Sequence, residues 1–232
     1  MEKLRAVGRY FTVGEWLLWG ISAAVIVVSF CLFDRESYLT LAASLIGVTS
    51  LIFAAKGNPL SQVLMVVFSI LYGIISYTFA YYGEMVTYLG MAMPMAVLAL
   101  ISWLKNPFEG NRSEVKVNAI SKKEVAFLCV LAAVVTVAFY FILRFFHTAN
   151  LLPSTLSVTT SFVAVYLTFR RSPYYALAYA TNDVVLIVLW VMAALSEVRY
   201  LSVMVCFVAF LVNDLYGLIS WRKMGKRQGL GR

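Results

Sequence analysis

Residues 199–221 read RYLSVMVCFVAFLVNDLYGLISW, an apolar run in which Arg199 and Asp214 are the only charged side chains. At a rise of about 1.5 Å per residue, a helix of this length crosses a hydrocarbon core of roughly 30 Å. Other runs of the same kind precede it along the chain. We therefore predict an all-α integral membrane protein with about eight transmembrane helices, at residues 14–33, 38–55, 59–82, 84–104, 124–146, 154–169, 173–195 and 199–221.

The composition of the whole chain supports a membrane location. Of its 232 residues, 62% are hydrophobic and 13% are charged, whereas soluble domains average ~45–50% apolar and ~25% charged residues. The net charge of +8 does not indicate nucleic-acid binding, because the basic residues flank apolar runs instead of forming one exposed face. The three cysteines and the one histidine, His147, lack metal-ligand spacing, so we expect no metal and no cofactor.

The basic residues predict the orientation of the spans. With a cytoplasmic N-terminus, only Arg35, Arg144 and Arg199 lie on the outside, as the positive-inside rule favours. Both termini are then cytoplasmic. The inside segments hold Lys3, Arg5, Arg9, Lys56, Lys105, Arg112, Lys116, Lys122, Lys123, Arg170, Arg171, Arg222, Lys223, Lys226, Arg227 and Arg232. Indole rings favour the headgroup region, so we expect interface anchors at three tryptophans near span ends: Trp16, Trp103 and Trp221.

Two parts of the chain contain similar short motifs at the ends of their spans, in the same order. Gly57-Asn58-Pro59 opens the third span and Arg171-Ser172-Pro173 opens the seventh. Ile101-Ser102-Trp103 closes the fourth span and Ile219-Ser220-Trp221 closes the eighth. One span separates the two groups of three helices, so both groups have the same orientation. This 3+1+3 plan is a parallel repeat of the kind that transporters use, with the solute bound between the halves.

The repeat divides the chain into five parts. The segments are an N-terminal segment with an extra transmembrane helix (1–37), a first three-helix repeat (38–104), a cytoplasmic linker with a linker helix (105–150), a second three-helix repeat (151–223) and a basic cytoplasmic tail (224–232). The linker's polar stretch contains Asn106-Pro107 and Gly110-Asn111, which is typical of a connection and not of a folded domain. Inside the first repeat, Pro94 is expected to bend its helix.

Polar side chains inside the spans predict a solute site. An ionisable group in a lipid-embedded helix costs roughly 2.5–3.5 kcal/mol by insertion scales, so Asp183 and Asp214 should face the bundle interior. Each follows an asparagine, and helical spacing places aromatic residues on the same faces. The predicted substrate-binding residues are Gln62, Tyr72, Tyr179, Asn182, Asp183, Trp190, Asn213, Asp214 and Tyr216. Rings around a carboxylate suit a flat, cationic or neutral heteroaromatic solute through stacking and cation–π attraction. The alternative is that these groups only make interhelical hydrogen bonds.

The chain resembles the PnuC family of nicotinamide riboside transporters. The resemblance is carried by Val212-Asn213-Asp214-Leu215-Tyr216-Gly217 running into Ser220-Trp221-Arg222-Lys223, and by Trp103-Leu104-Lys105-Asn106-Pro107-Phe108 continuing to Glu114-Val115-Lys116-Val117-Asn118. The 3+1+3 plan with a leading helix adds to it. The resemblance covers nearly the whole chain.

This resemblance implies a function. It implies facilitated diffusion of nicotinamide riboside across the bacterial inner membrane, through a site between the repeats. A cytoplasmic kinase would trap the product, and the chain could form homotrimers, as family members do. Thiamine and riboflavin transporters share the plan and remain alternatives. A membrane-embedded enzyme or sensor is an alternative of another class, but the sequence offers no catalytic cluster for it.

Overall fold

The structure is a computed structural model that describes residues 10–78, 82–148 and 150–230. Within this part of the chain, eight helices are long and apolar enough to cross a membrane, at Val13–Phe33, Tyr38–Ala55, Leu60–Tyr77, Tyr82–Lys105, Lys122–Phe145, Leu151–Phe169, Tyr175–Ala194 and Val198–Arg227. The prediction of an all-α protein with eight spans is therefore confirmed. Four basic residues used in the orientation argument, Lys3, Arg5, Arg9 and Arg232, lie outside the described residues.

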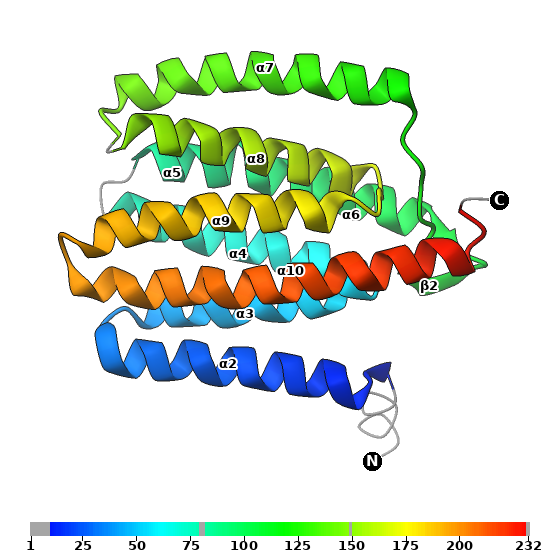
Figure 1. Ribbon diagram of the computed structural model, residues 1–232, viewed down its shortest axis with the longest axis horizontal. Coiled ribbons are helices and arrows are strands. Elements are labelled where there is room, and N and C mark those ends of the chain that lie inside the picture. The colour runs from blue at the N-terminus through cyan, green and yellow to red at the C-terminus, as the bar shows by residue number, and fades with distance from the viewer. Residues whose placement is uncertain (1–9, 79–81, 149, 231–232) are drawn as a thin grey trace.

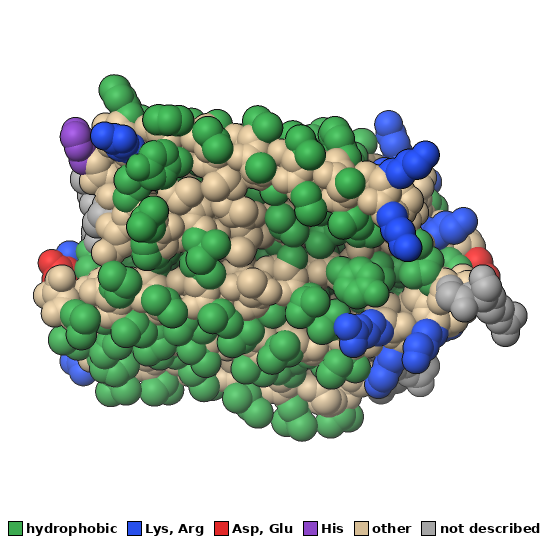
Figure 2. All heavy atoms as spheres, turned by 45° about the horizontal axis from the view of Figure 1, so that its top comes forward, with side chains coloured by type: hydrophobic (Ala, Val, Ile, Leu, Met, Phe, Trp, Pro, Cys, Tyr) green, Lys and Arg blue, Asp and Glu red, His purple; other side chains and the backbone are tan. Residues whose placement is uncertain are grey.

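The helices lie side by side along the long axis of the molecule, with α7 (Lys122–Phe145) and α2 (Val13–Phe33) on opposite flanks (Figure 1). Between them are α3 (Tyr38–Ala55), α4 (Leu60–Thr78), α8 (Leu151–Phe169), α9 (Tyr175–Ala194) and α10 (Leu201–Arg227). Hydrophobic side chains cover the flank of the bundle, and Lys and Arg gather at its ends (Figure 2). We call the end with Lys56, Arg170 and Arg227 the basic end, and the other, with Arg35 and Arg199, the distal end.

The fourth span combines three helical segments. It runs from α5 (Tyr82–Thr87) through a π-helical turn, η1 (Tyr88–Ala92), into α6 (Met93–Lys105). Pro94 has no N–H group, and its ring would collide with the carbonyl four residues earlier. The wider turn directly before it relieves this conflict, and such turns are frequent at functional sites.

The repeated tripeptides join the two repeats at the basic end. The indole N–H of Trp103, on α6, donates to the carbonyl oxygen of Thr168 at the end of α8 (2.9 Å). That of Trp221, on α10, donates to the carbonyl oxygen of Ala54 at the end of α3 (2.7 Å). Both indoles are 0% exposed and their ring centroids are 5.4 Å apart. The prediction that they anchor the interface is wrong, because orphan carbonyls of the other repeat attract their N–H groups. Trp16, 41% exposed, is compatible with its predicted place.

The serines before these tryptophans repeat the pattern. Ser102 Oγ donates to the carbonyl of Phe169 (2.9 Å), and Ser220 Oγ donates to the carbonyl of Ala55 (2.6 Å). Each repeat thus caps the C-terminal end of the first helix of the other repeat. We call the Ser102–Trp103 and Ser220–Trp221 contacts the two clasps.

The loops that open the third and seventh spans also match. Gly57 and Arg171 both have left-handed backbone angles, with φ of 67° and 56°. Each offers its carbonyl to the linker: Val115 N–H donates to Gly57 (2.9 Å), and Asn118 N–H donates to Arg171 (3.0 Å). The linker, expected as a plain connection, folds into an antiparallel hairpin of β1 (Pro107–Phe108) and β2 (Asn111–Val115). It ties the equivalent loops of both repeats together.

The helix that precedes the first repeat has a counterpart in the linker helix. In α2, Thr12 Oγ1 accepts a hydrogen bond from the backbone N–H of Glu15 (3.2 Å); in α7, Ser121 Oγ accepts one from that of Glu124 (3.2 Å). Both are N-cap contacts with the same Ser/Thr-x-x-Glu spacing. Glu15 then pairs with Lys56 after α3, and Glu124 pairs with Arg170 after α8. The molecule is therefore built as two four-helix units.

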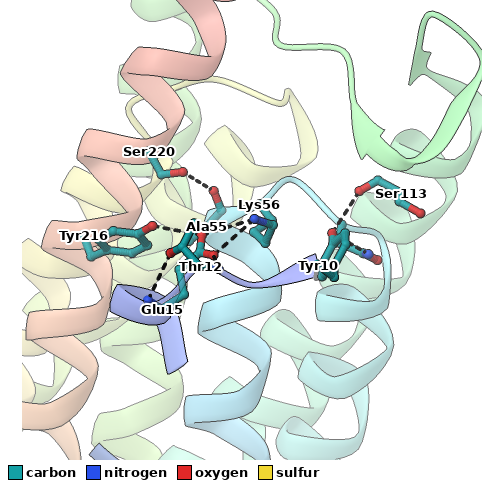
Figure 3. A network of polar contacts seen from close by, with 9 residues as sticks. Tyr10, Thr12, Glu15, Ala55, Lys56, Ser113, Tyr216 and Ser220 are labelled. Carbon is teal, nitrogen blue, oxygen red and sulfur yellow. Dashed lines mark hydrogen bonds and ion pairs between the residues drawn. The ribbon is translucent and has the colours of Figure 1, made fainter. Parts of the chain in front are cut away.

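Glu15 is the more deeply buried of the two carboxylates. Its side chain is 4% exposed; it accepts from Lys56 Nζ at 3.2 Å and from Tyr216 Oη at 2.9 Å (Figure 3). Since Lys56 follows α3 and Tyr216 is on α10, Glu15 ties α2 to both repeats next to one clasp.

Candidate functional site

A cavity of about 60 Å³ lies between the two repeats in the middle of the bundle. Asp183, near the centre of the 20-residue α9, marks its depth. The first repeat contributes Gly47, Leu51, Met65, Phe68, Ser69, Tyr88 and Ala92 to its wall, and the second contributes Ser161, Val165, Tyr179, Asn182, Asp183, Leu186, Phe207, Phe210 and Asp214. We call it the central cavity.

Two carboxyl groups meet in the central cavity. Asp183 of α9 and Asp214 of α10 are each 3% exposed, and both line the central cavity. Two buried carboxylates in one cavity repel each other, and a cation between them relieves that repulsion. The Asp183–Asp214 pair therefore suits a positively charged solute.

The amide next to the pair is held in a fixed orientation. Asn182 Oδ1 accepts from Thr160 Oγ1 (2.8 Å) and from Ser161 Oγ (3.0 Å), both on α8. Because the oxygen is engaged, the NH2 group of Asn182 is the part of this side chain that can donate to a solute.

Several buried polar atoms have no hydrogen-bond partner among the described residues. They include Ser69 Oγ and Asp183 Oδ2 in the central cavity, and Tyr72 Oη next to it. A buried polar group left unpaired costs about 1–3 kcal/mol, and such groups in a native structure call for an explanation such as water or a ligand. These unpaired atoms make the central cavity the candidate site for a polar solute.

Aromatic rings form much of the remaining wall. The Phe68 centroid lies 6.0 Å from those of Tyr88 and Phe210, in edge-on and tilted arrangements. Phe210 approaches α3 so closely that a Cβ on Gly47 would lie 2.4 Å from its Cζ. Glycine at position 47 is what allows the ring to sit there.

Four of the nine predicted site residues line the central cavity: Tyr179, Asn182, Asp183 and Asp214. The other five lie elsewhere. Trp190 and Tyr72 are nearer the distal end, where both line a small cavity. Gln62 donates to Ser61 Oγ (3.2 Å) in the first turns of α4. Asn213 donates to Ser22 Oγ of α2 (2.9 Å), and Tyr216 bonds to Glu15.

One physical cause separates the predicted residues that line the central cavity from those that do not. Neighbouring positions on a helix point about 100° apart, so Asp214 can face the cavity while Asn213 faces α2. The sequence gives that angle but not which helix packs on which face. The missed residues are mostly apolar, such as Phe68, Leu186 and Phe207, and hydrophobicity does not distinguish a cavity wall from a core. The polar residue Ser69 is different, because it lies at helical spacing from Tyr72 on α4 and this pattern predicts that it faces the interior.

The charge of the cavity wall has one sign. Its described lining residues include two carboxyl groups and no Lys, Arg or His. A site of this kind, with ring faces and carboxylates, attracts a flat organic cation and repels an anion.

Comparisons with known proteins agree with this geometry. The family described as "Nicotinamide mononucleotide transporter" matches residues 37–223. A relative from Neisseria mucosa, named nicotinamide riboside transporter PnuC, is 31% identical over 221 residues, which cover 91% of this chain and 81% of the relative. A solved structure titled "Crystal structure of the Vitamin B3 transporter PnuC" superposes with a TM-score of 0.82 at 25% identity and covers 94% of each chain.

Eight spans, an internal parallel repeat and a polar cavity between the halves define a multi-pass membrane transporter, and its relatives are transporters, not enzymes. The chain belongs to the nicotinamide mononucleotide transporter family, and its resemblance to the PnuC proteins is confirmed.

Proposed function

We propose that this chain carries nicotinamide riboside across the membrane by facilitated diffusion, with the solute bound in the central cavity. The observation that carries the proposal is the buried Asp183–Asp214 pair, surrounded by rings and by polar atoms that lack partners. Nicotinamide riboside is a flat pyridinium cation with a hydroxyl-bearing sugar. Its charge suits the carboxyl pair, its ring suits the aromatic wall, and its hydroxyls suit Ser69 and Asn182.

The charge of the cavity favours the riboside over the mononucleotide in the family's name. The two solutes differ by a phosphate, which carries about −1.5 to −2 charges at pH 7. No described lining residue of the central cavity is a cation that could pair with it, and two carboxyl groups would lie close by. Burying an unpaired anion there is strongly unfavourable.

Transport requires the repeats to separate in turn at each end. The central cavity of about 60 Å³ holds a few water molecules, so a riboside needs it to widen. At the basic end the route is closed by Trp103 and Trp221, which are fully buried. We infer that opening this end breaks the two clasps, while the linker hairpin keeps the repeats tethered.

The cellular setting is part of the proposal. The excess of Lys and Arg at the basic end supports a cytoplasmic location for that end, in the bacterial inner membrane. A tag at the C-terminus should then react with an impermeant probe only after the cells are permeabilised. Trapping by a cytoplasmic riboside kinase and assembly into a homotrimer are further parts. Trapping is contradicted if cells without the kinase still accumulate the riboside. The homotrimer is contradicted if the purified protein has the mass of a monomer.

Uptake by proteoliposomes tests the function directly. Vesicles containing the protein should take up nicotinamide riboside to equilibrium, without an ion gradient, and should exclude nicotinamide mononucleotide. Thiamine and riboflavin belong in the same panel. Faster passage of thiamine, riboflavin or the mononucleotide than of the riboside would contradict the proposal, and so would chemical conversion of the solute.

A further inference from the structure

A second and larger cavity lies at the distal end. Its volume is about 180 Å³, and Glu84 is the only charged residue among its described lining residues. Trp190 and Tyr200 supply ring surface to it, with centroids 5.6 Å apart, and Asn150 and Ser154 add polar groups. We call it the distal cavity.

The distal cavity and the central cavity share two helices in their walls. In the fourth span, Glu84 lines the distal cavity, and Tyr88, one turn deeper, lines the central one. In α9, Leu189 lines the distal cavity, and Leu186, three residues deeper, lines the central one. Residues three or four apart lie on one helix face. Both helices therefore lead from one cavity to the other, with Tyr88 at the boundary.

The two cavities share the same chemistry. Each combines a carboxyl group with aromatic rings, and neither has a cation among its described lining residues. Arg199 is a basic residue at the distal end, but it lines another cavity, of about 20 Å³, and it pairs with Glu197. Glu84 lies in the first turn of α5, at the distal end of the fourth span, and its side chain is half-buried in the cavity wall.

We propose that the distal cavity is a first binding station for the cationic solute. Glu84 supplies the attracting charge and Trp190 supplies a ring face, before the solute passes Tyr88 to the Asp183–Asp214 pair. This inference rests on the proposed function and adds a residue that governs entry. A carboxylate at the mouth of a low-dielectric cleft raises the local concentration of a cation, and this effect weakens with salt.

The test is the Michaelis constant for riboside uptake by proteoliposomes with the distal end outward, at low (about 20 mM) and high (about 300 mM) salt. In the native protein, KM should rise with salt. Glu84→Gln should raise KM about fivefold at low salt and remove the salt dependence, with the maximal rate unchanged. Trp190→Leu should raise KM while the salt dependence stays. Glu36→Gln, an exposed carboxylate at the same end outside the cavity lining, is the matched control and should change neither.

Each outcome has a definite meaning. If Glu84→Gln keeps the native KM at both salt concentrations, or loses maximal rate without a change in KM, the binding station is refuted. If the Gln variant does not fold, Glu84→Asp takes its place: retained salt dependence supports the proposal, and its loss contradicts it. Absence of riboside uptake by the native protein would instead refute the proposed function itself.

Discussion

Gly47 shows how one residue shapes the central cavity. Its missing side chain leaves room for Phe210, whose Cζ would lie 2.4 Å from an added Cβ, and Phe68 would lie 3.1 Å away. If position 47 carries a methyl group, the Phe210 ring must move and the Phe68 ring must give by a few tenths of an ångström, because the interior is closely packed. The free space nearest to them is the central cavity itself.

We therefore predict that Gly47→Ala weakens riboside binding by about tenfold or more, which corresponds to about 1.4 kcal/mol. Isothermal titration of the purified protein measures this. Gly20→Ala on α2 is the matched control, since no atom lies within 4 Å of its added Cβ. Equal affinities for both variants would mean that Phe210 does not bound the binding site.

At the same scale, the sequence predicted which charged groups line the central cavity better than which other polar residues line it. Asp183 and Asp214 were found because a carboxyl group in a span must face inward. Asn213 and Tyr216 were assigned to the site because they are polar, but their partners are on α2, whose position beside α10 is not encoded in the helical spacing. Periodicity gives a direction around one helix and no information about the neighbour in that direction.

Among the elements, α2 and α7 hold equivalent places. Each packs against the next helix of its own unit, α3 or α8, and contacts the last span of the other unit: α10 for α2, and the α5 part of the fourth span for α7. The acid at the third position of each helix pairs with the base that follows the next helix. The sequence predicted one helix as an extra and the other as a linker, because the two share little beyond a Ser/Thr-x-x-Glu spacing.

The two ion pairs differ in burial, so their removal should have unequal effects. Glu15 is 4% exposed and Lys56 22%, whereas Glu124 and Arg170 are 17% and 37% exposed. Breaking a buried pair leaves an uncompensated charge and costs up to about 3–5 kcal/mol, while exposed pairs contribute about 0–1 kcal/mol. Glu15→Gln should therefore lower the melting temperature in detergent more than Glu124→Gln does. A larger loss of melting temperature for Glu124→Gln than for Glu15→Gln would contradict the inference that the more buried ion pair contributes more to stability.

For the whole molecule, hydropathy was enough to predict the number of spans and their class. The cost of burying charge in lipid acts on each segment separately, so a one-dimensional pattern reveals it. The repeat was also visible, since Ile-Ser-Trp recurs at the same span end. What the tripeptides do was not visible: their indoles were expected at the lipid headgroups and instead close the basic end between the repeats.

The hairpin illustrates the same difference. The backbone hydrogen bonds from Val115 in the hairpin to Gly57 and from Asn118 just after it to Arg171 depend on two loops that are far apart in sequence and close only in the folded bundle. A local pattern of Asn, Pro and Gly identifies a turn-rich connection and carries no information about such long-range partners.

The central claim is that the Asp183–Asp214 pair binds the solute through its positive charge. Isothermal titration of nicotinamide riboside and nicotinamide mononucleotide into the native protein, Asp183→Asn and Asp214→Asn tests it most directly. We predict at least a tenfold loss of riboside affinity in each variant, about 1.4 kcal/mol or more, and much weaker binding of the mononucleotide to the native protein. Unchanged riboside affinity in both variants, or tighter binding of the mononucleotide, would contradict the account.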